Sequence, residues 1–177
     1  MRKLRSNLYS LLQGKSRKVV LAAMPSVVLI FSLLVMAASC EKPEKFPMDV
    51  SFTEYSLEGT SCQWTNLNYN KDLIVINSNE ELENYISCSD GSYIEIDFSK
   101  YTLLLASGQT RNAPIEEITK KLTKTAKNEY DFDIDVTTGN LRAITPWLVA
   151  ITVSKISDDA VVSLNVNEHY YDYNYDN

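Results

Sequence analysis

Histidine, cysteine and glycine are scarce in this sequence. Among 177 residues there are one histidine, three cysteines and five glycines. Structural zinc sites need clusters of histidine and cysteine, and the chain contains neither a Gly-x-Ser-x-Gly nucleophile elbow nor a glycine-rich phosphate loop. These absences remove the common signatures of metalloproteins, serine hydrolases and nucleotide-binding enzymes, so we expect no metal, no cofactor and no catalytic role.

Positive charge is also scarce after the first 39 residues. Residues 1–39 hold six of the 17 basic residues and none of the 23 acidic ones, so the remaining 138 residues carry 11 basic and 23 acidic residues, a net charge of −12. Nucleic-acid binding needs clustered lysine and arginine, so nucleic acid is excluded as a partner. The 45% apolar content is too high for an acidic disordered chain, and the length fits one domain.

An uncharged run of 21 residues, 19–39, follows Lys18 and ends at Cys40. Its length would suffice for a transmembrane helix, but the basic flank before it and the small residues at 37–39 favour a cleaved export signal. An uncleaved membrane anchor and ordinary secretion are the alternatives. The Ala-Ala-Ser-Cys segment resembles the lipobox of bacterial lipoproteins, which implies cleavage before Cys40 and acyl chains on it that hold the protein to a membrane.

The residue after Cys40 is Glu41 rather than aspartate. In enteric-type sorting an aspartate at this place directs retention in the inner membrane, so the resemblance implies the outer membrane, at its periplasmic face or at the cell surface. We therefore expect a signal peptide at 1–39, a lipidated cysteine and an extended tether at 40–48, one globular domain at 49–168 and a disordered tail at 169–177.

Two cysteines, Cys62 and Cys88, remain once Cys40 is assigned to lipid. An even pair in an exported domain is most simply a disulfide. Two buried free thiols are the alternative. A nucleophilic cysteine would need a base, and the only histidine, His169, lies in the polar tail.

One main helix is predicted after a short apolar strand at 73–76. Ser78 with Glu81 three residues later forms a capping box, and Leu82, Tyr85 and Ile86 follow at helical spacing. This helix would end near Cys88. Its glutamates lie in the first turns, where the helix dipole favours negative charge, so they are given no catalytic role.

Short apolar or alternating segments predict further strands at 101–107, 130–136, 144–154 and 161–166, with one or two more within 50–69. Residues 115–125 fit a helix or a strand, and their threonine content favours a strand. Gly108 and 138–140 are predicted to end strands. Turn-length connections indicate antiparallel pairing. The predicted fold class is α+β and β-dominated: an antiparallel twisted sheet or sandwich of about seven strands with one main helix.

Two patterns suggest binding sites. Asp131, Asp133 and Asp135 have the spacing that begins an EF-hand loop, but Val136 and Arg142 stand where that loop needs glycine and glutamate; alternation on a strand explains the aspartates without a metal. Tyrosine and tryptophan are enriched at interfaces. The candidate binding residues are Trp64, Tyr69 and the tail tyrosines, whereas Tyr130, Phe132 and Trp147 are assigned to the core.

The order of elements over 73–166 carries a family resemblance. A buried strand and a Glu-rich helix precede Ile-Asp-Phe-Ser-Lys at 96–100, an apolar strand that reaches Gly108, and Pro146-Trp147. This order resembles the C-terminal domain family named after the PrcB protease-complex subunit. The resemblance implies a non-enzymatic accessory domain of an envelope complex, with no catalytic residues to assign.

Three functions follow from these observations. The first is a lipid-anchored cell-envelope protein that binds another protein or a glycan and catalyses nothing. The second is an envelope hydrolase that uses two carboxylates, for which the many acidic residues give no specific signal. The third is a structural spacer or inhibitor, which would present a rigid exposed loop at 107–114.

Overall fold

The computed structural model describes residues 44–90 and 93–170. The predicted signal peptide, Cys40 and the tail from 171 onward lie outside these ranges. The described residues belong to one compact unit that starts at Glu44, and no helix within them is long and apolar enough to cross a bilayer. The elements, in chain order, are β1 (Met48–Asp49), β2 (Phe52–Glu54), β3 (Cys62–Trp64), β4 (Asp72–Ile76), α2 (Asn79–Glu83), β5 (Ile86–Cys88), β6 (Tyr101–Ala126), β7 (Glu129–Ser154) and β8 (Val161–Tyr170).

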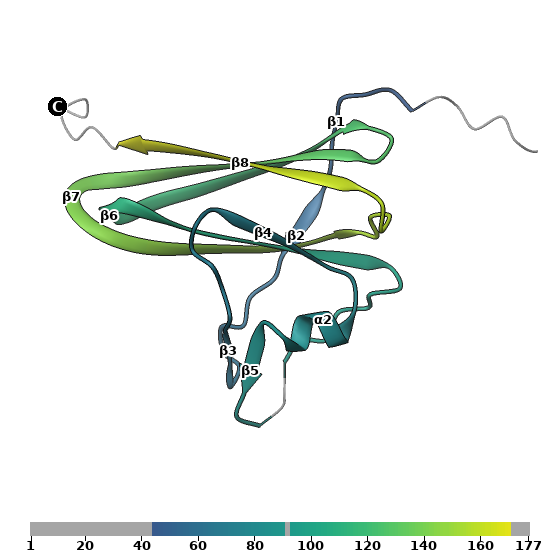
Figure 1. Cartoon of the computed structure of the whole chain (residues 1–177), viewed down its shortest axis with the longest axis horizontal. Helices are drawn as coiled ribbons and strands as arrows, with labels where there is room; N and C mark the ends of the chain where they lie inside the picture. Colours follow the sequence, from purple (N-terminus) through teal and green to yellow (C-terminus); the bar gives the residue numbers. More distant parts are fainter. Residues whose placement is uncertain (1–43, 91–92, 171–177) are drawn as a thin grey trace, which may run out of the picture. The chain divides into compact units, whose positions relative to one another are not determined.

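The centre of the fold is one long hairpin formed by β6 and β7. The two strands pair antiparallel from Tyr101↔Ser154 to Ala126↔Glu129. Their pairing register shifts between Thr110 and Glu117, and such extra residues bend a strand and increase its twist. The hairpin accordingly curves back on itself at this bend (Figure 1). The segment at 115–125 is therefore a strand, as its threonine content favoured.

Four shorter strands extend the hairpin into a six-stranded sheet. β4 pairs with the beginning of β6 and β2 with the end of β7, on one side of the bend. β1 pairs with the end of β6 and β8 with the beginning of β7, on the other side. β3 and β5 form a separate two-stranded sheet. The structure is β-rich, as predicted, with one five-residue helix in the described residues.

The sheet is mixed rather than antiparallel, because β8 pairs with β7 in parallel from Glu129↔Val161 to Thr138↔Tyr170. Parallel neighbours need a crossover of roughly a dozen residues or more. Here the second half of β7 and the 155–160 connection form that crossover. The bend brings the end of β7 back beside its beginning, and the backbone N–H of Val161 donates to the carbonyl of Asn128.

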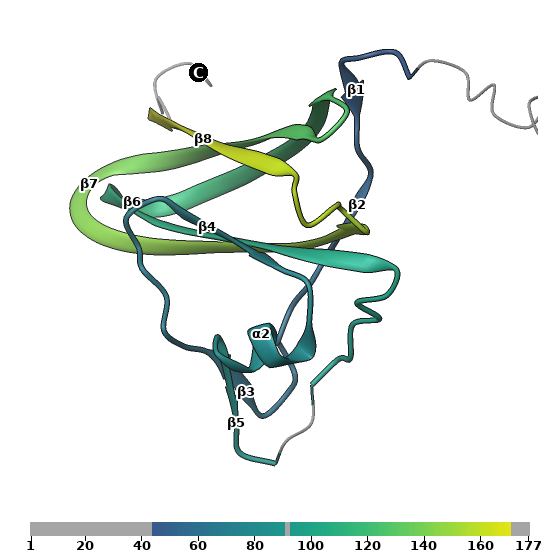
Figure 2. The same ribbon diagram turned by 45° about the vertical axis from the view of Figure 1, so that its right-hand side comes forward.

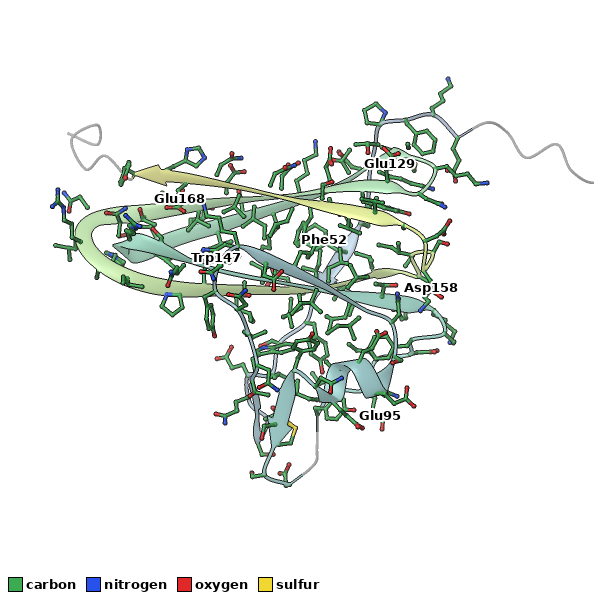
Figure 3. All side chains as sticks on the ribbon, viewed as in Figure 1. Phe52, Glu95, Glu129, Trp147, Asp158 and Glu168 are labelled. Carbon is green, nitrogen blue, oxygen red and sulfur yellow. A yellow bond between two sulfur atoms is a disulfide. The ribbon has the colours of Figure 1, made fainter. Side chains whose placement is uncertain are left out.

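The two halves of the bent hairpin face each other (Figure 2). A buried cluster takes side chains from both halves (Figure 3). Phe52 and Trp147, both labelled in Figure 3, lie between these halves. The burial of each large apolar side chain contributes about 1.5–3 kcal/mol. The fully buried members include Leu104, Leu122, Phe132, Ile134, Val136, Ile151 and Val153. Phe132 and Trp147 are thus core residues, as predicted.

A second cluster lies on the opposite face of the same strands. Leu103 and Leu105 alternate with Leu104 and Ala106, and each pair contributes to a different cluster. Because β6 is buried on both faces here, its sequence is a continuous apolar run rather than an alternating one. The second cluster packs these leucines against residues of β4, α2 and β5, namely Ile76, Leu82 and Ile86.

The predicted disulfide is confirmed. Cys62 and Cys88 are bonded, and they are directly opposite residues of β3 and β5. One half of the predicted capping box is present, because the backbone N–H of Glu81 donates to Oγ of Ser78, the N-cap, at 3.2 Å. The Glu81 carboxylate accepts from the backbone N–H of Asn77, one residue before the N-cap, at 2.6 Å. The helix itself is shorter than predicted. It ends at Glu83, and Ile86 and Cys88 belong to β5.

Two predicted strand ends are wrong. β6 continues through Gly108, and β7 continues through 138–140 and through Pro146. In each case the hydrogen-bonded neighbour strand holds the chain extended where the local sequence favours a turn. Pro146 is tolerated inside β7 because it pairs only with Gln109 of β6, on a stretch where no other described strand adjoins β7.

Candidate functional site

The bend of the long hairpin carries the most distinctive surface in the described part of the chain. A hollow of about 600 Å³ lies there, where β6, β7 and the end of β8 meet. We call this the bend surface. Its lining residues are Arg111, Asn112, Arg142, Ala143, Ile144 and Tyr170.

The local structure explains why these side chains point outward. The register shift between Thr110 and Asn112 places Arg111 of β6 opposite two residues of β7, Ala143 and Ile144, and such a bulge turns residues out of the regular alternation. Across the hairpin, residues 140–144 are all exposed. The bend thus places two arginines from different strands around one hollow.

Neither arginine side chain has an ion-pair partner among the described residues. The ion pairs observed within residues 44–90 and 93–170 are formed by lysines and by His169, and neither Arg111 nor Arg142 takes part in one of them. In a domain of net negative charge, a guanidinium group would be expected to form an ion pair with a nearby carboxylate. Its planar fork is suited to bidentate binding of a carboxylate or phosphate.

Large apolar side chains adjoin the arginines and are unusually exposed. The exposed fractions are 64% for Leu141, 73% for Ile144 and 69% for Tyr170. A single exposed leucine needs no explanation, but Ile144 and Tyr170 line the same hollow as the two arginines and form one mixed surface with them. Arginine and tyrosine are also the residue types that most often dominate the energy of protein interfaces.

The bend of β6 and β7 lies at the opposite end of the sheet from β1 (Figures 1 and 2). Residues 44–47 adjoin the other end of β6, where Nζ of Lys124 lies 2.7 Å from the Glu44 carboxylate and 5.4 Å from the centre of the Phe46 ring. The ion pair raises the pKa of Lys124 and keeps it charged. The predicted tether is therefore partly bound to the domain.

The predicted binding residues lie elsewhere. Trp64 is half-buried, meets the Tyr55 ring edge-on at 6.0 Å and packs against the second cluster, so most of its surface serves the core. Tyr69 is 38% exposed and is not a member of either cluster. The structure does not bring these two residues to the bend surface. Of the tail tyrosines, Tyr170 does line it, and His169 and Tyr170 are the last residues of β8.

A second hollow, of about 470 Å³, lies between the end of β4 and the 155–160 connection. Glu81, Asp158 and Lys155 line it, but Glu81 already accepts from the backbone of Asn77 and Asp158 from the Asn77 amide at 3.3 Å. Its polar groups thus bond to one another and hold the connection in place.

Two of the three aspartates of β7 are also bonded to side chains of β8. Asp133 accepts from Asn165 at 2.9 Å, and Asp135 accepts from Asn167 at 3.1 Å and contacts His169 at 3.1 Å. His169 and Asn167 lower the pKa of Asp135, so its carboxylate stays ionised. Within residues 44–90 and 93–170, no group of three or more acidic, cysteine or histidine side chains is arranged to hold a metal ion.

Little in the amino-acid sequence predicts the bend surface. Arg142 was considered only because it stands where a calcium loop needs glutamate. Residues 107–114, which were expected to form an exposed loop in a spacer or inhibitor, are part of β6. The available signal was the presence of two arginines on either side of a predicted turn in an otherwise acidic domain. That signal becomes informative only when the bulge and the bend are known.

Comparison with known proteins gives no relative: no protein-family model, curated protein or solved structure matches this chain.

Proposed function

We propose that this chain is a lipid-anchored protein of the bacterial cell envelope, held to the outer membrane through Cys40, whose folded domain binds a partner protein at the bend surface and catalyses nothing. The lipobox-like segment before Cys40 supports the anchor. The likeness to the PrcB C-terminal family supports an accessory role. The observation that carries the proposal is the pair of arginines, without an ion-pair partner among the described residues, that lines one hollow with the exposed Ile144 and Tyr170.

We also infer that the bent hairpin is best regarded as a two-layered, sandwich-like arrangement. Support comes from the cluster in which buried side chains of both halves of β6 and β7 pack together. Such an arrangement fixes the bend as a rigid tip. Binding surfaces on rigid supports lose less conformational entropy when a partner docks.

The position and composition of the bend surface favour a protein over a glycan. Sugar recognition generally needs polar groups that bond hydroxyls, whereas this surface presents aliphatic side chains, one tyrosine and two cations. A partner with an apolar centre and carboxylates around it would satisfy both features. The bend also lies at the opposite end of the sheet from β1 (Figure 1).

Photo-crosslinking from Ile144 tests this proposal. A photoreactive residue at this position, in the full lipoprotein in its own membranes, should form one discrete protein adduct, and a photoreactive residue at Lys127 should not. The double variant Arg111→Glu/Arg142→Glu should reduce the adduct by more than about tenfold, because interface arginines contribute about 2 kcal/mol or more each.

The matched control reverses two exposed lysines far from the bend, in Lys45→Glu/Lys127→Glu, with the same change in net charge. Adduct formation should survive this change. Equal loss in both double variants would show a general effect of charge, and a carbohydrate adduct at Ile144 would replace the proposed protein partner with a glycan.

A further inference from the structure

Among the described strands, β8 has one unpaired edge that runs along its whole length. It pairs with β7 on one side over all ten residues, Val161–Tyr170, and no other described strand pairs with its outer side. The other terminal strands of the sheet are shorter: β1 has two residues, β2 three and β4 five. A free edge presents unpaired backbone N–H and C=O groups that favour pairing with another strand.

The usual protections of an edge strand are missing from β8. It contains no proline, lysine or arginine, and its register with β7 has no shift from beginning to end. Its one carboxylate, Glu168, is bound by Lys71 at 2.9 Å and by the Thr110 hydroxyl at 3.2 Å, as Figure 3 helps to locate. No charge or bulge therefore prevents a second strand from approaching this edge.

The side chains of β8 alternate in the way that an added strand requires. Val162, Leu164 and Val166 are half-buried against the core cluster, whereas Ser163 and Asn165 are exposed on the outer face. A neighbouring strand with the same alternation would cover the three aliphatic side chains. It would also extend the row of asparagine and aspartate side chains that β7 and β8 share.

We propose that the occupant of this edge is β8 of a second copy, paired antiparallel about a two-fold axis perpendicular to the sheet. The core faces of both copies then lie on the same side of the joined sheet only if the axis passes between one residue and the same residue of the second copy. The longest pairing results when this residue is near the middle of the strand. An axis at Asn165 or at Val166 pairs nine residues on each strand.

The sequence of β8 is self-complementary in both arrangements. With the axis at Asn165, Leu164 lies opposite Val166 and Glu168 opposite Val162. With the axis at Val166, Leu164 lies opposite Glu168. Neither arrangement places like charges opposite each other, which is the main penalty in cross-strand pairs. The product is a homodimer with one continuous sheet across its centre.

Crosslinking in membranes tests this directly. Asn165→Cys in the full chain, treated with a short bis-maleimide, should give a covalent product with twice the mass of one chain. The control Thr119→Cys lies on the same outer face, on β6, two strands inward from the edge, and should stay monomeric. An adduct with a different protein, or no adduct at Asn165, would overturn the second copy as the occupant.

A pair of charge variants gives an independent test on the purified full chain. Asn165→Lys/Asn167→Lys places both new lysines at the edge, each beside an aspartate of β7, so the monomer should remain folded. The control Thr119→Lys/Thr123→Lys makes the same change in net charge on β6, which lies on the other side of β7 from the edge strand. Edge lysines should raise the dimer dissociation constant by about tenfold or more.

The control separates edge pairing from net charge. Added lysines reduce the negative charge of the domain, so if overall repulsion governed association, both double variants would strengthen it equally. The proposal requires weaker association in the edge variant alone. Sedimentation of the wild type as a single chain at every concentration, or equal behaviour of the two variants, would overturn it.

Discussion

Gly108 and Trp147 are directly opposite residues of β6 and β7, and the indole ring covers the glycine. A Cβ atom at Gly108 would lie 2.6 Å from Cε2 of Trp147, which is too close for a real contact. Trp147 is 3% exposed, so its ring has no free space into which to move. Gly108→Ala should therefore lower the free energy of unfolding by about 1–3 kcal/mol, measured by urea denaturation.

A double-mutant cycle separates this clash from a general effect of alanine in a strand. Trp147→Leu alone should destabilise through lost packing, but Gly108→Ala should cost little in that background because the ring is gone. Additive effects of the two substitutions would show that the ring is not what excludes a side chain at Gly108.

The contribution of Asp97 to the stability of the folded state should depend on pH. Hydrogen bonds from Lys100 at 2.6 Å and from Ser99 hold the pKa of Asp97 at about 2. A carboxyl whose pKa is lower in the folded state stabilises that state above its unfolded pKa, about 3.9, and loses this contribution as pH falls towards 2. Asp97→Asn should thus lower the urea midpoint at pH 7 and leave it unchanged near pH 2.

The companion variant Lys100→Gln should reduce the pH 7 midpoint as well, by a smaller amount, because the bonds from Ser99 remain. A midpoint difference between wild type and Asp97→Asn that persists at pH 2 would contradict this assignment.

At the scale of elements, the disulfide is the main support of the β3–β5 pair. Each of these strands has three residues, and so short a pair is not stable on its own. The bond joins residues 26 apart, for which chain entropy gives about 3 kcal/mol. Cys62→Ala/Cys88→Ala should lose roughly this stability in thermal unfolding. Two free thiols in the native wild type would contradict the pairing.

The sequence predicted most elements because their signals are local. The capping box at Ser78, the alternation at 130–136 and the apolar run at 103–105 each report on their own segment. Strand ends were predicted less well. Glycine alone favours a turn, yet Gly108 and Gly139 both lie within long strands. Each leaves room for a close neighbour: Gly108 contacts the Trp147 ring, and Gly139 contacts the backbone of Ala113. These are contacts between distant segments, which a local pattern does not contain.

At the scale of the whole molecule, the same limitation applies to the sheet and the site. The parallel pairing of β8 depends on the bend returning Ser154 to the beginning of β7, and the bend depends on register shifts between two strands. The bend surface has the same origin. Arg111 and Arg142 are 31 positions apart in the sequence, and only the bulged hairpin places them around one hollow.

The contact between residues 44–47 and the domain sets how freely the domain moves on its tether. Lys124 pairs with Glu44 and lies over the Phe46 ring, and both contacts hold this segment against the domain. Lys124→Gln should release the segment, so trypsin should cleave after Lys45 about fivefold faster in the native protein. The control Lys121→Gln, which removes the exposed pair with Asp49, should leave this rate unchanged. Equal rates in the two variants would mean that Lys124 does not hold the segment.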